Sequence, residues 1–178
     1  MIKLRTLLDK DIPGMLEWMH DEDIASHFRF NCLSTTYDDV LNFVKKSHSD
    51  DKNRHFAIVD KDDEYLGTIS LKNIDFENLK AEYAVVLRKK YHGCGYGKIA
   101  TDLIVDYAFN ELGLNKIYLN VLEENSQAIS FYEKYGFIYE GCAYEDIIID
   151  GKKKNLKWYC LLKGETNEWY SWNCCRVF

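Results

Sequence analysis

The sequence predicts an α+β domain with a twisted, mixed and mostly antiparallel sheet of about seven strands and about four helices. Three observations predict this class. Short turns join three consecutive strand patterns in the middle of the chain, which is typical of an antiparallel meander. A single strand–helix–strand unit follows, and it requires one parallel pair of strands. The chain has 178 residues, of which 47% are hydrophobic, so one domain with a sizeable core is expected.

The N-terminal part of the chain predicts one strand and two helices. Residues 3–8 have a strand pattern. Asp9 or Asp11 then caps a first helix. A second helix is predicted to begin after Thr36, because Thr36 and Asp39 have the spacing of a capping box.

The rest of the chain supplies the sheet and two more helices. Turns of a few polar residues separate the three strands of the meander, and Gly113 is placed to end the third helix as a C-cap. The predicted elements are strands at 55–59, 65–74 and 80–87, a helix over 100–112, a strand at 116–122, a helix over 126–135, and strands at 137–150 and 156–163 joined by a turn at Asp150 and Gly151.

Composition excludes several classes of protein. The formal net charge of -6 argues against nucleic-acid binding, which needs a basic surface. No apolar run approaches the ~20 residues that span a bilayer, and the N-terminus has no signal-peptide pattern. The six cysteines form no CxxC pair, so no metal site is expected. We therefore expect a cytoplasmic protein without membrane or nucleic-acid partners.

The chain divides into a domain of residues 1–164 and an aromatic C-terminal tail of residues 165–178. Trp169 and Trp172 make the tail too apolar to be left free in water. Because Trp and Tyr are common at protein interfaces, we expect the tail to lie close to the contact of a possible homodimer.

A glycine-rich segment follows the strand at 80–87 and precedes a helix. Backbone N–H groups converge at such a junction, and the helix dipole adds partial positive charge, so the segment predicts a phosphate site. A kinase-type P-loop is excluded, since Ile99 stands where Ser or Thr is required. The dinucleotide pattern G-x-G-x-x-A is satisfied by Gly95, Gly97 and Ala100. However, it lies in mid-chain after an antiparallel meander, which disfavours a dinucleotide fold.

Two motifs together resemble the GCN5-related N-acetyltransferase (GNAT) superfamily. The segment 92–97, His-Gly-Cys-Gly-Tyr-Gly, is similar to the family's acyl-CoA loop Q/R-x-x-G-x-G/A, except that His92 replaces Gln or Arg. The segment 125–137 is similar to the downstream signature N-x-x-A-x-x-x-Y-x-K-x-G-F. The resemblance covers about residues 2–163 and is greatest for the ribosomal-protein, polyamine and nucleotide-amino-sugar acetyltransferases. It implies a GNAT-like sheet with a central β-α-β unit that binds acetyl-CoA as cosubstrate.

The resemblance also implies which residues form the site. Tyr132 corresponds to the family's general acid, or hydrogen-bond donor, to the CoA thiolate. Asn125 corresponds to an Asn that contacts the pantetheine arm, although it also suits the N-cap of the following helix. The backbone N–H groups of Val85 and Leu87 are implied to bind the thioester or pantetheine. The pyrophosphate cradle is implied to comprise Gly93, Cys94, Gly95, Tyr96, Gly97 and Lys98.

Glu82 is the candidate general base. A primary amine with a pKa near ~10.4 is only ~0.04% free base at pH 7, which corresponds to roughly 4.6 kcal/mol. A carboxylate on a largely apolar strand beside the loop is suited to remove the amine proton. The alternative is that Glu82 merely forms an ion pair with Lys72 or Lys80.

The predicted function is direct transfer of an acetyl group to a primary amine of a small molecule, a polyamine or an amino sugar. The acceptor is expected near the acidic stretch between Glu17 and His27, which has an alternative interpretation as a solvated helix end. Three other functions stay open: a protein N-terminal acetyltransferase, a non-catalytic acyl-CoA-binding domain and an NAD-binding oxidoreductase.

Overall fold

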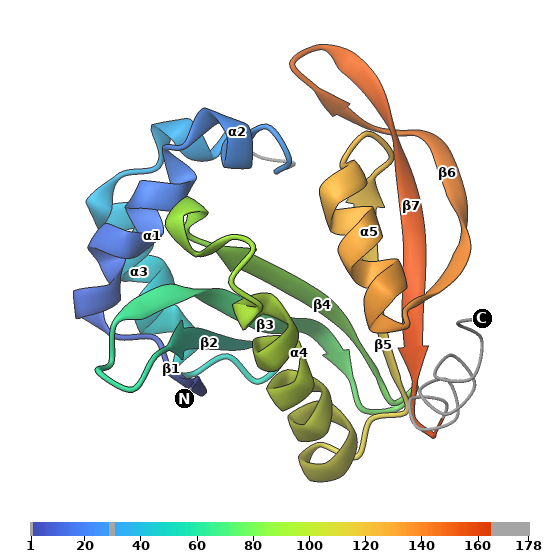
Figure 1. Cartoon of the computed structure of the whole chain (residues 1–178), viewed down its shortest axis with the longest axis horizontal. Coiled ribbons are helices and arrows are strands. Elements are labelled where there is room, and N and C mark those ends of the chain that lie inside the picture. Colours follow the sequence, from blue (N-terminus) through green and yellow to red (C-terminus); the bar gives the residue numbers. More distant parts are fainter. Residues whose placement is uncertain (1, 29–30, 165–178) are drawn as a thin grey trace.

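The computed structural model describes residues 2–28 and 31–164, which form a seven-stranded sheet with helices on both faces (Figure 1). The strand order is β1-β2-β3-β4-β5-β7-β6, and within the described ranges only β4 and β5 are parallel. The α+β class with one β-α-β unit is confirmed. The elements are β1 (Lys3–Thr6), α1 (Ile12–Met19), α2 (Glu22–Ala25), α3 (Tyr37–Ser47), β2 (Arg54–Val59), β3 (Tyr65–Asp75), β4 (Lys80–Leu87), α4 (Tyr96–Asp106), β5 (Lys116–Leu122), α5 (Ser126–Tyr135), β6 (Ile138–Ile149) and β7 (Lys152–Leu162).

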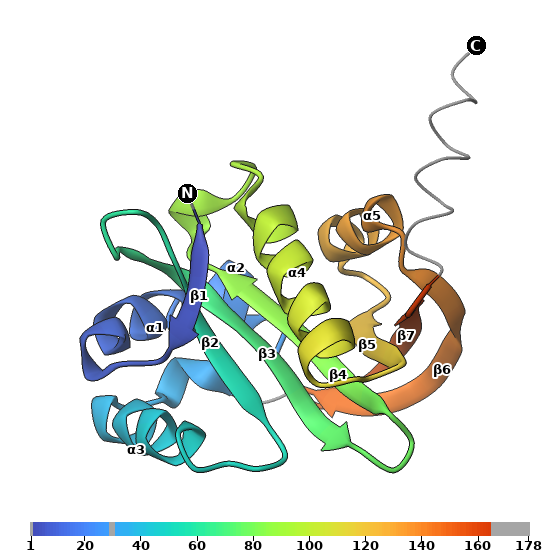
Figure 2. The same cartoon turned by 90° about the horizontal axis from the view of Figure 1, so that it is seen from below.

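Helices lie on both faces of the sheet (Figure 2). The two faces bury separate apolar clusters. α4 and α5 cover one face, where Ile69, Tyr83 and Ile104 are buried. α1 and α3 cover the other face over β1–β3, where Met15 and Val44 are buried. Because side chains alternate between faces along a strand, β2 and β3 contribute to both clusters, whereas the buried residues of β5 and β7 in these clusters belong to the cluster under α4 and α5.

The N-terminal region differs from the prediction in two ways. It contains one additional helix, and the Asp11 side chain does not cap α1. Asp11 stands at the N-cap of α1, but its side chain makes no capping bond. It instead accepts two hydrogen bonds from Arg5, at 2.7 and 2.8 Å, and one from the Leu8 backbone N–H. Asp11 is almost completely buried. A buried carboxylate is stable only when paired, and Arg5 satisfies it better than a helix end. The additional helix is α2, which Asp21 caps.

The other boundaries follow the predictions closely, with two differences. The helix expected over 100–112 begins at Tyr96 and changes at Tyr107–Glu111 into a π-helical turn. β7 begins at Lys152 rather than Leu156, because the turn at Asp150 and Gly151 lets the lysine-rich segment pair directly with β6. The capping box of Thr36 and Asp39 is confirmed.

No helix within the described ranges is long and apolar enough to cross a membrane. The predicted aromatic tail, residues 165–178, lies outside the described residues, and so does its expected place at a dimer contact.

Candidate active site

β4 and β5 form a fork at the centre of the sheet. They pair only over three positions, from Lys80 opposite Lys116 to Glu82 opposite Tyr118, and then diverge (Figure 1). On their other edges, β5 pairs with β7 and β4 pairs with β3. Past Glu82, the open side of β4 therefore presents backbone groups that no strand of the described chain satisfies.

The register between β3 and β4 decides which backbone groups point into the fork. The Arg88 N–H donates to the Leu66 carbonyl at 2.9 Å, so Arg88 occupies a hydrogen-bonded position of this antiparallel pair. Such positions alternate along an antiparallel ladder. The N–H groups of Val85 and Leu87 therefore point away from β3 and into the fork, which is the arrangement expected of these two residues.

The glycine-rich segment lies beside the fork and ends at the N-terminus of α4. Gly93 and Gly95 have φ angles of +75° and +80°, a region that glycine adopts without a steric penalty. Gly95 is the N-cap of α4, and the first helical hydrogen bond runs from the Ile99 N–H to its carbonyl. The N–H groups of the first turn of α4 precede this bond and point toward the N-terminal end of the helix, which is where an anion binds.

His92 and Cys94 have local roles in this segment. The His92 Nε2 lies 2.9 Å from the Leu87 carbonyl oxygen, and this contact ties the segment to the end of β4. The Cys94 thiol is exposed and contacts the His92 carbonyl oxygen at 3.7 Å. Both residues therefore shape the loop.

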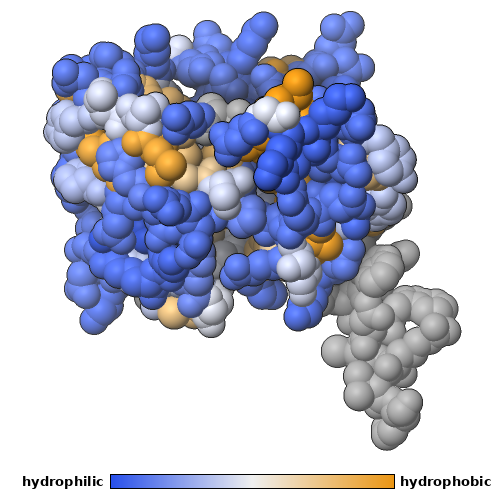
Figure 3. Space-filling view, turned by 90° about the horizontal axis from the view of Figure 1, so that it is seen from above, coloured by the Kyte–Doolittle hydropathy of each residue, from blue (hydrophilic) through white to orange (hydrophobic). Residues whose placement is uncertain are grey.

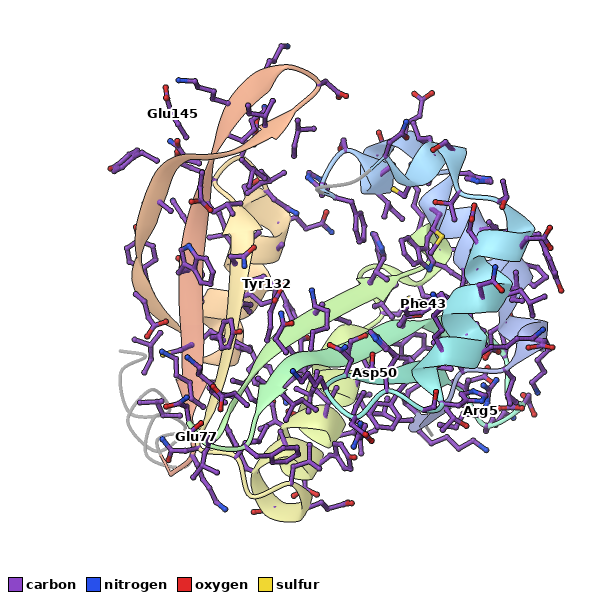
Figure 4. The ribbon with its side chains drawn as sticks, turned by 180° about the vertical axis from the view of Figure 1, so that it is seen from behind. Arg5, Phe43, Asp50, Glu77, Tyr132 and Glu145 are labelled. Atoms are coloured by element: carbon purple, nitrogen blue, oxygen red, sulfur yellow. The ribbon has the colours of Figure 1, made fainter. Side chains whose placement is uncertain are left out.

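Tyr132 projects from α5 into the apolar cluster that α4 and α5 cover, next to the fork (Figure 4). Its ring packs edge-on against Tyr83 of β4 at 6.2 Å and against Phe137 at 5.5 Å. Burial raises the pKa of Tyr132 to about 12. Within the part of the chain that the structure describes, no protein group is hydrogen-bonded to its hydroxyl. The hydroxyl is therefore a protonated donor that is available to a ligand.

Glu82 lies at the point where the strands diverge, on the face opposite α4. One carboxylate oxygen accepts from Lys72 at 2.8 Å and the other accepts from Asn73 at 2.9 Å. The pairing with Lys72, which was the alternative interpretation of Glu82, is therefore present. Tyr118 and Trp158 stack on the same face, with ring centroids 6.2 Å apart. Trp158 also lines an open hollow of about 330 Å³ beside β6.

Asn125 is the N-cap of α5. Its Oδ1 accepts a hydrogen bond from the Ala128 N–H at 3.1 Å, which confirms the capping interpretation. Its predicted contact with the pantetheine arm stays a prediction.

The acidic N-terminal stretch is paired with basic residues that immediately precede the glycine segment. Glu17 is bonded to Arg88, and Lys89 is bonded to Asp21 and Asp23. These carboxylates tie α1 and α2 to the segment that precedes α4. They are consequently less available to an acceptor than the sequence suggested.

Two residues that the sequence interpretation did not select bridge β4 and α4. The Thr101 hydroxyl donates to the Gly97 carbonyl at 2.7 Å and lies 2.7 Å from the Tyr83 hydroxyl. Both side chains are buried. The only signal in the sequence is a hydroxyl residue at a core-facing helix position.

Similarity to known proteins identifies the family to which this chain belongs. A family model described as an acetyltransferase (GNAT) domain matches residues 2–138. The chain belongs to the GNAT family, and it is an acetyl-CoA-dependent N-acetyltransferase. The NAD-binding alternative is not supported, because the parallel pairing needed for a dinucleotide fold is confined to β4 and β5.

Individual relatives agree over nearly the whole chain. The chain is 27% identical over 164 residues to spermidine N(1)-acetyltransferase of Vibrio cholerae, covering 92% of this chain and 94% of that protein. It is 30% identical over 158 residues to the enzyme of the same name from Escherichia coli K12, covering 89% and 78%. The crystal structure of the Vibrio cholerae spermidine N-acetyltransferase with CoA and spermine superposes with a TM-score of 0.85, at 26% identity, covering 93% of this chain and 97% of that chain.

A shorter match is to a protein named for a different acceptor. Over 104 residues the chain is 35% identical to a putative ribosomal N-acetyltransferase of Bacillus subtilis, covering 58% of this chain and 57% of that protein.

Proposed function

We propose that this enzyme acetylates a primary amine of a polyamine such as spermidine or spermine. The observation that carries the proposal is the similarity, in both sequence and fold, to spermidine N-acetyltransferases over nearly the full length of this chain. The acceptor lies on the face of the fork that carries Glu82, Tyr118 and Trp158. Aromatic rings and carboxylates are suited to an alkylammonium chain.

In the proposed complex, acetyl-CoA lies in the fork on the α4 side. Gly93, Cys94 and Gly95, together with Tyr96, Gly97 and Lys98, surround the pyrophosphate with backbone N–H groups. The N–H groups of Val85 and Leu87 bind the pantetheine arm or the thioester carbonyl. Asn125 contacts the pantetheine arm from the start of α5.

The proposed reaction is a direct transfer. The amine nitrogen attacks the thioester carbonyl carbon, a C–N bond forms, and the C–S bond breaks. Glu82 accepts the proton that the amine must lose, and the Tyr132 hydroxyl donates a hydrogen bond to the departing thiolate.

Gly95→Val tests the pyrophosphate cradle. We expect at least tenfold weaker CoA binding, or about 1.4 kcal/mol, because a side chain at this position occupies the space through which the pyrophosphate approaches. Apart from the two adjacent residues, no atom of the described residues lies within 4 Å of a Cβ built at Gly95, so the substituted side chain has room in the protein itself. Isothermal titration calorimetry with CoA measures the affinity.

A matched control separates this effect from backbone strain. Gly113 has a φ angle of +69°, and among residues 2–28 and 31–164, its two neighbours aside, no atom lies within 4 Å of a Cβ built there. Gly113→Val therefore carries a similar strain at the far end of the helical segment, and we expect it to leave CoA affinity unchanged. Equal affinities for the Gly95 variant and the wild type would contradict the cradle.

A screen of amines tests the acceptor. CoA thiol release is measured with polyamines, amino-sugar nucleotides, amino acids, aminoglycosides and N-terminal peptides. We expect spermidine and spermine to give the highest kcat/KM. A preference for ribosomal-type N-terminal peptides would replace the polyamine proposal with protein acetylation. Binding of acetyl-CoA without transfer to any acceptor would favour the acyl-CoA-binding alternative.

We further propose that the enzyme is a cytoplasmic homodimer. The homodimer is proposed because of the aromatic composition of residues 165–178. Light scattering of the full chain, and of a variant lacking residues 166–178, measures the oligomeric state and the contribution of the tail.

A further inference from the structure

A β-bulge brings two neighbouring side chains of β3 onto Glu82. The regular register of β3 with β4 ends where Lys72 lies opposite Glu82, and it shifts before Asp75. Asn73, which lies within this irregular stretch, has a φ angle of +51°, a left-handed conformation that asparagine adopts more readily than most residues. Successive residues of a regular strand point to opposite faces, whereas here Lys72 and Asn73 both bind the same carboxylate.

The Lys72 amine meets the first requirement for an acceptor nitrogen. Its Nζ lies 2.8 Å from Glu82 Oε1. A general base must lie within hydrogen-bond reach, about 2.6–3.2 Å, of the group whose proton it removes. Glu82 is also the last residue of β4 that pairs with β5, so the fork opens directly beyond it. A primary amine is therefore held against the proposed base and beside the proposed site of the thioester.

A partly exposed ion pair holds the Lys72 side chain in this place. The side chain is 36% exposed, and that of Glu82 is 17% exposed. Such a pair contributes little to stability, and the flexible four-carbon stem of lysine lets Nζ shift while the backbone stays in β3. Holding an amine beside a thioester replaces a bimolecular encounter with an effectively intramolecular one. Lys72 Nζ thus has a large kinetic advantage over the other lysines of the protein surface.

We propose that Lys72 is a site of self-acetylation, which takes place when acetyl-CoA is bound and the acceptor amine is absent. The Nζ ammonium loses one proton to Glu82, and Nζ attacks the thioester carbonyl carbon. The C–N bond of the amide forms, the C–S bond breaks, and the second proton lost by the nitrogen ends on the CoA sulfur. Glu82 then releases its proton to water. The product is a neutral side chain that no longer pairs with Glu82.

The inference rests on the proposed function, because it uses the same thioester, the same base and the same direct transfer. Mass spectrometry of the full chain after incubation with acetyl-CoA tests it. We expect the chain to gain an acetyl group that peptide mapping assigns to Lys72, with a rate constant that is independent of enzyme concentration. Lys72→Arg keeps the cation but removes the primary amine, and it should abolish this gain. A rate constant that rises with enzyme concentration would mean that one molecule acetylates another, and would overturn the proposal.

Lys116 is a matched control within the same protein. It also pairs with a glutamate, Glu140, and its side chain is 30% exposed, which is close to the exposure of Lys72. It lies on β5 where that strand still pairs with β4, before the fork opens. We expect Lys72 to be acetylated at least about tenfold faster than Lys116, because Lys72 pairs with the proposed base. Equal rates would indicate random chemical acetylation by acetyl-CoA and would overturn the proposal.

Two changes remove the conditions for self-acetylation. Glu82→Gln removes the base, and a saturating acceptor from the amine screen competes for it. Each should slow the acetylation of Lys72 at least about tenfold and leave that of Lys116 unchanged, and an undiminished rate in either case would overturn the proposed route. If screened amines are acetylated normally and Lys72 stays unmodified, this inference alone fails. If CoA binds but neither the amines nor Lys72 are acetylated, the proposed function fails with it.

Discussion

Tyr132→Phe is expected to lower kcat about a hundredfold while the affinity for acetyl-CoA stays within twofold of the wild type. Only the departing thiolate needs the hydroxyl, and removing one donor to developing charge typically costs about 10²–10³ in rate. With its pKa raised to about 12, Tyr132 is a weak acid toward a thiol with a pKa near ~8.5. Full proton transfer is then uphill by about 5 kcal/mol, which favours a hydrogen-bonding role. Steady-state kinetics and calorimetry with acetyl-CoA measure the two quantities.

The control for Tyr132 is a second tyrosine of the same cluster. The Tyr159 hydroxyl donates to Glu133 at 2.9 Å, and its ring lies 6.4 Å from that of Tyr132. Tyr159→Phe removes a tyrosine hydroxyl from this core but leaves the Tyr132 hydroxyl in place, so we expect nearly normal turnover. If Tyr132→Phe also turns over normally, Tyr132 is a packing residue. If both variants lose activity equally, the effect is on the core rather than on the reaction.

Glu82→Gln is expected to lower the rate about a hundredfold near pH 7, within the range for loss of a general base. The deficit should shrink toward pH 10. The reason is the substrate amine, whose free-base share rises from ~0.04% at pH 7 to roughly 30% at pH 10. The measurement is kcat/KM for spermidine from pH 6.5 to 10. A loss that is the same at every pH would argue against proton removal by Glu82.

The ion pair of Glu82 with Lys72 provides the control for this experiment. Lys72→Met removes the cation but leaves the carboxylate, and the Lys72 side chain is 36% exposed. We expect less than a threefold change in rate, since a partly exposed ion pair contributes little by itself. A loss as large as that of Glu82→Gln would mean that the pair, rather than a free carboxylate, is what the site requires.

The chemical character of the molecular surface is compatible with binding of a polyamine. Seen from above, the molecule is mainly hydrophilic, with small hydrophobic areas (Figure 3). A flexible polycation requires few dedicated apolar contacts and gains from aromatic faces and dispersed carboxylates. Tyr118 illustrates this environment. Burial raises its pKa, and the negative charges of Glu82 and Asp75 raise it further.

The sequence by itself determined the features that depend on neighbouring residues. The meander, the β-α-β unit and the capping box follow from side-chain periodicity and short-range hydrogen bonds, and all three occur in the structure. The glycine segment was also predictable, since positive φ angles at Gly93 and Gly95 are local requirements. The resemblance to GNAT enzymes rested on the same local motifs, and the family match confirms it.

Only the tertiary structure decided how distant residues are paired. The choice between Lys72 and Lys80 as partner of Glu82, and the burial of Asp11 beside Arg5, depend on strand register and packing. The free N–H groups of Val85 and Leu87 likewise result from the register of β4 with β3 and its divergence from β5. The link from Tyr83 through Thr101 to Gly97 joins residues of two elements. Periodicity indicates which face a residue occupies, whereas its contact across that face is set by how the whole sheet twists and packs.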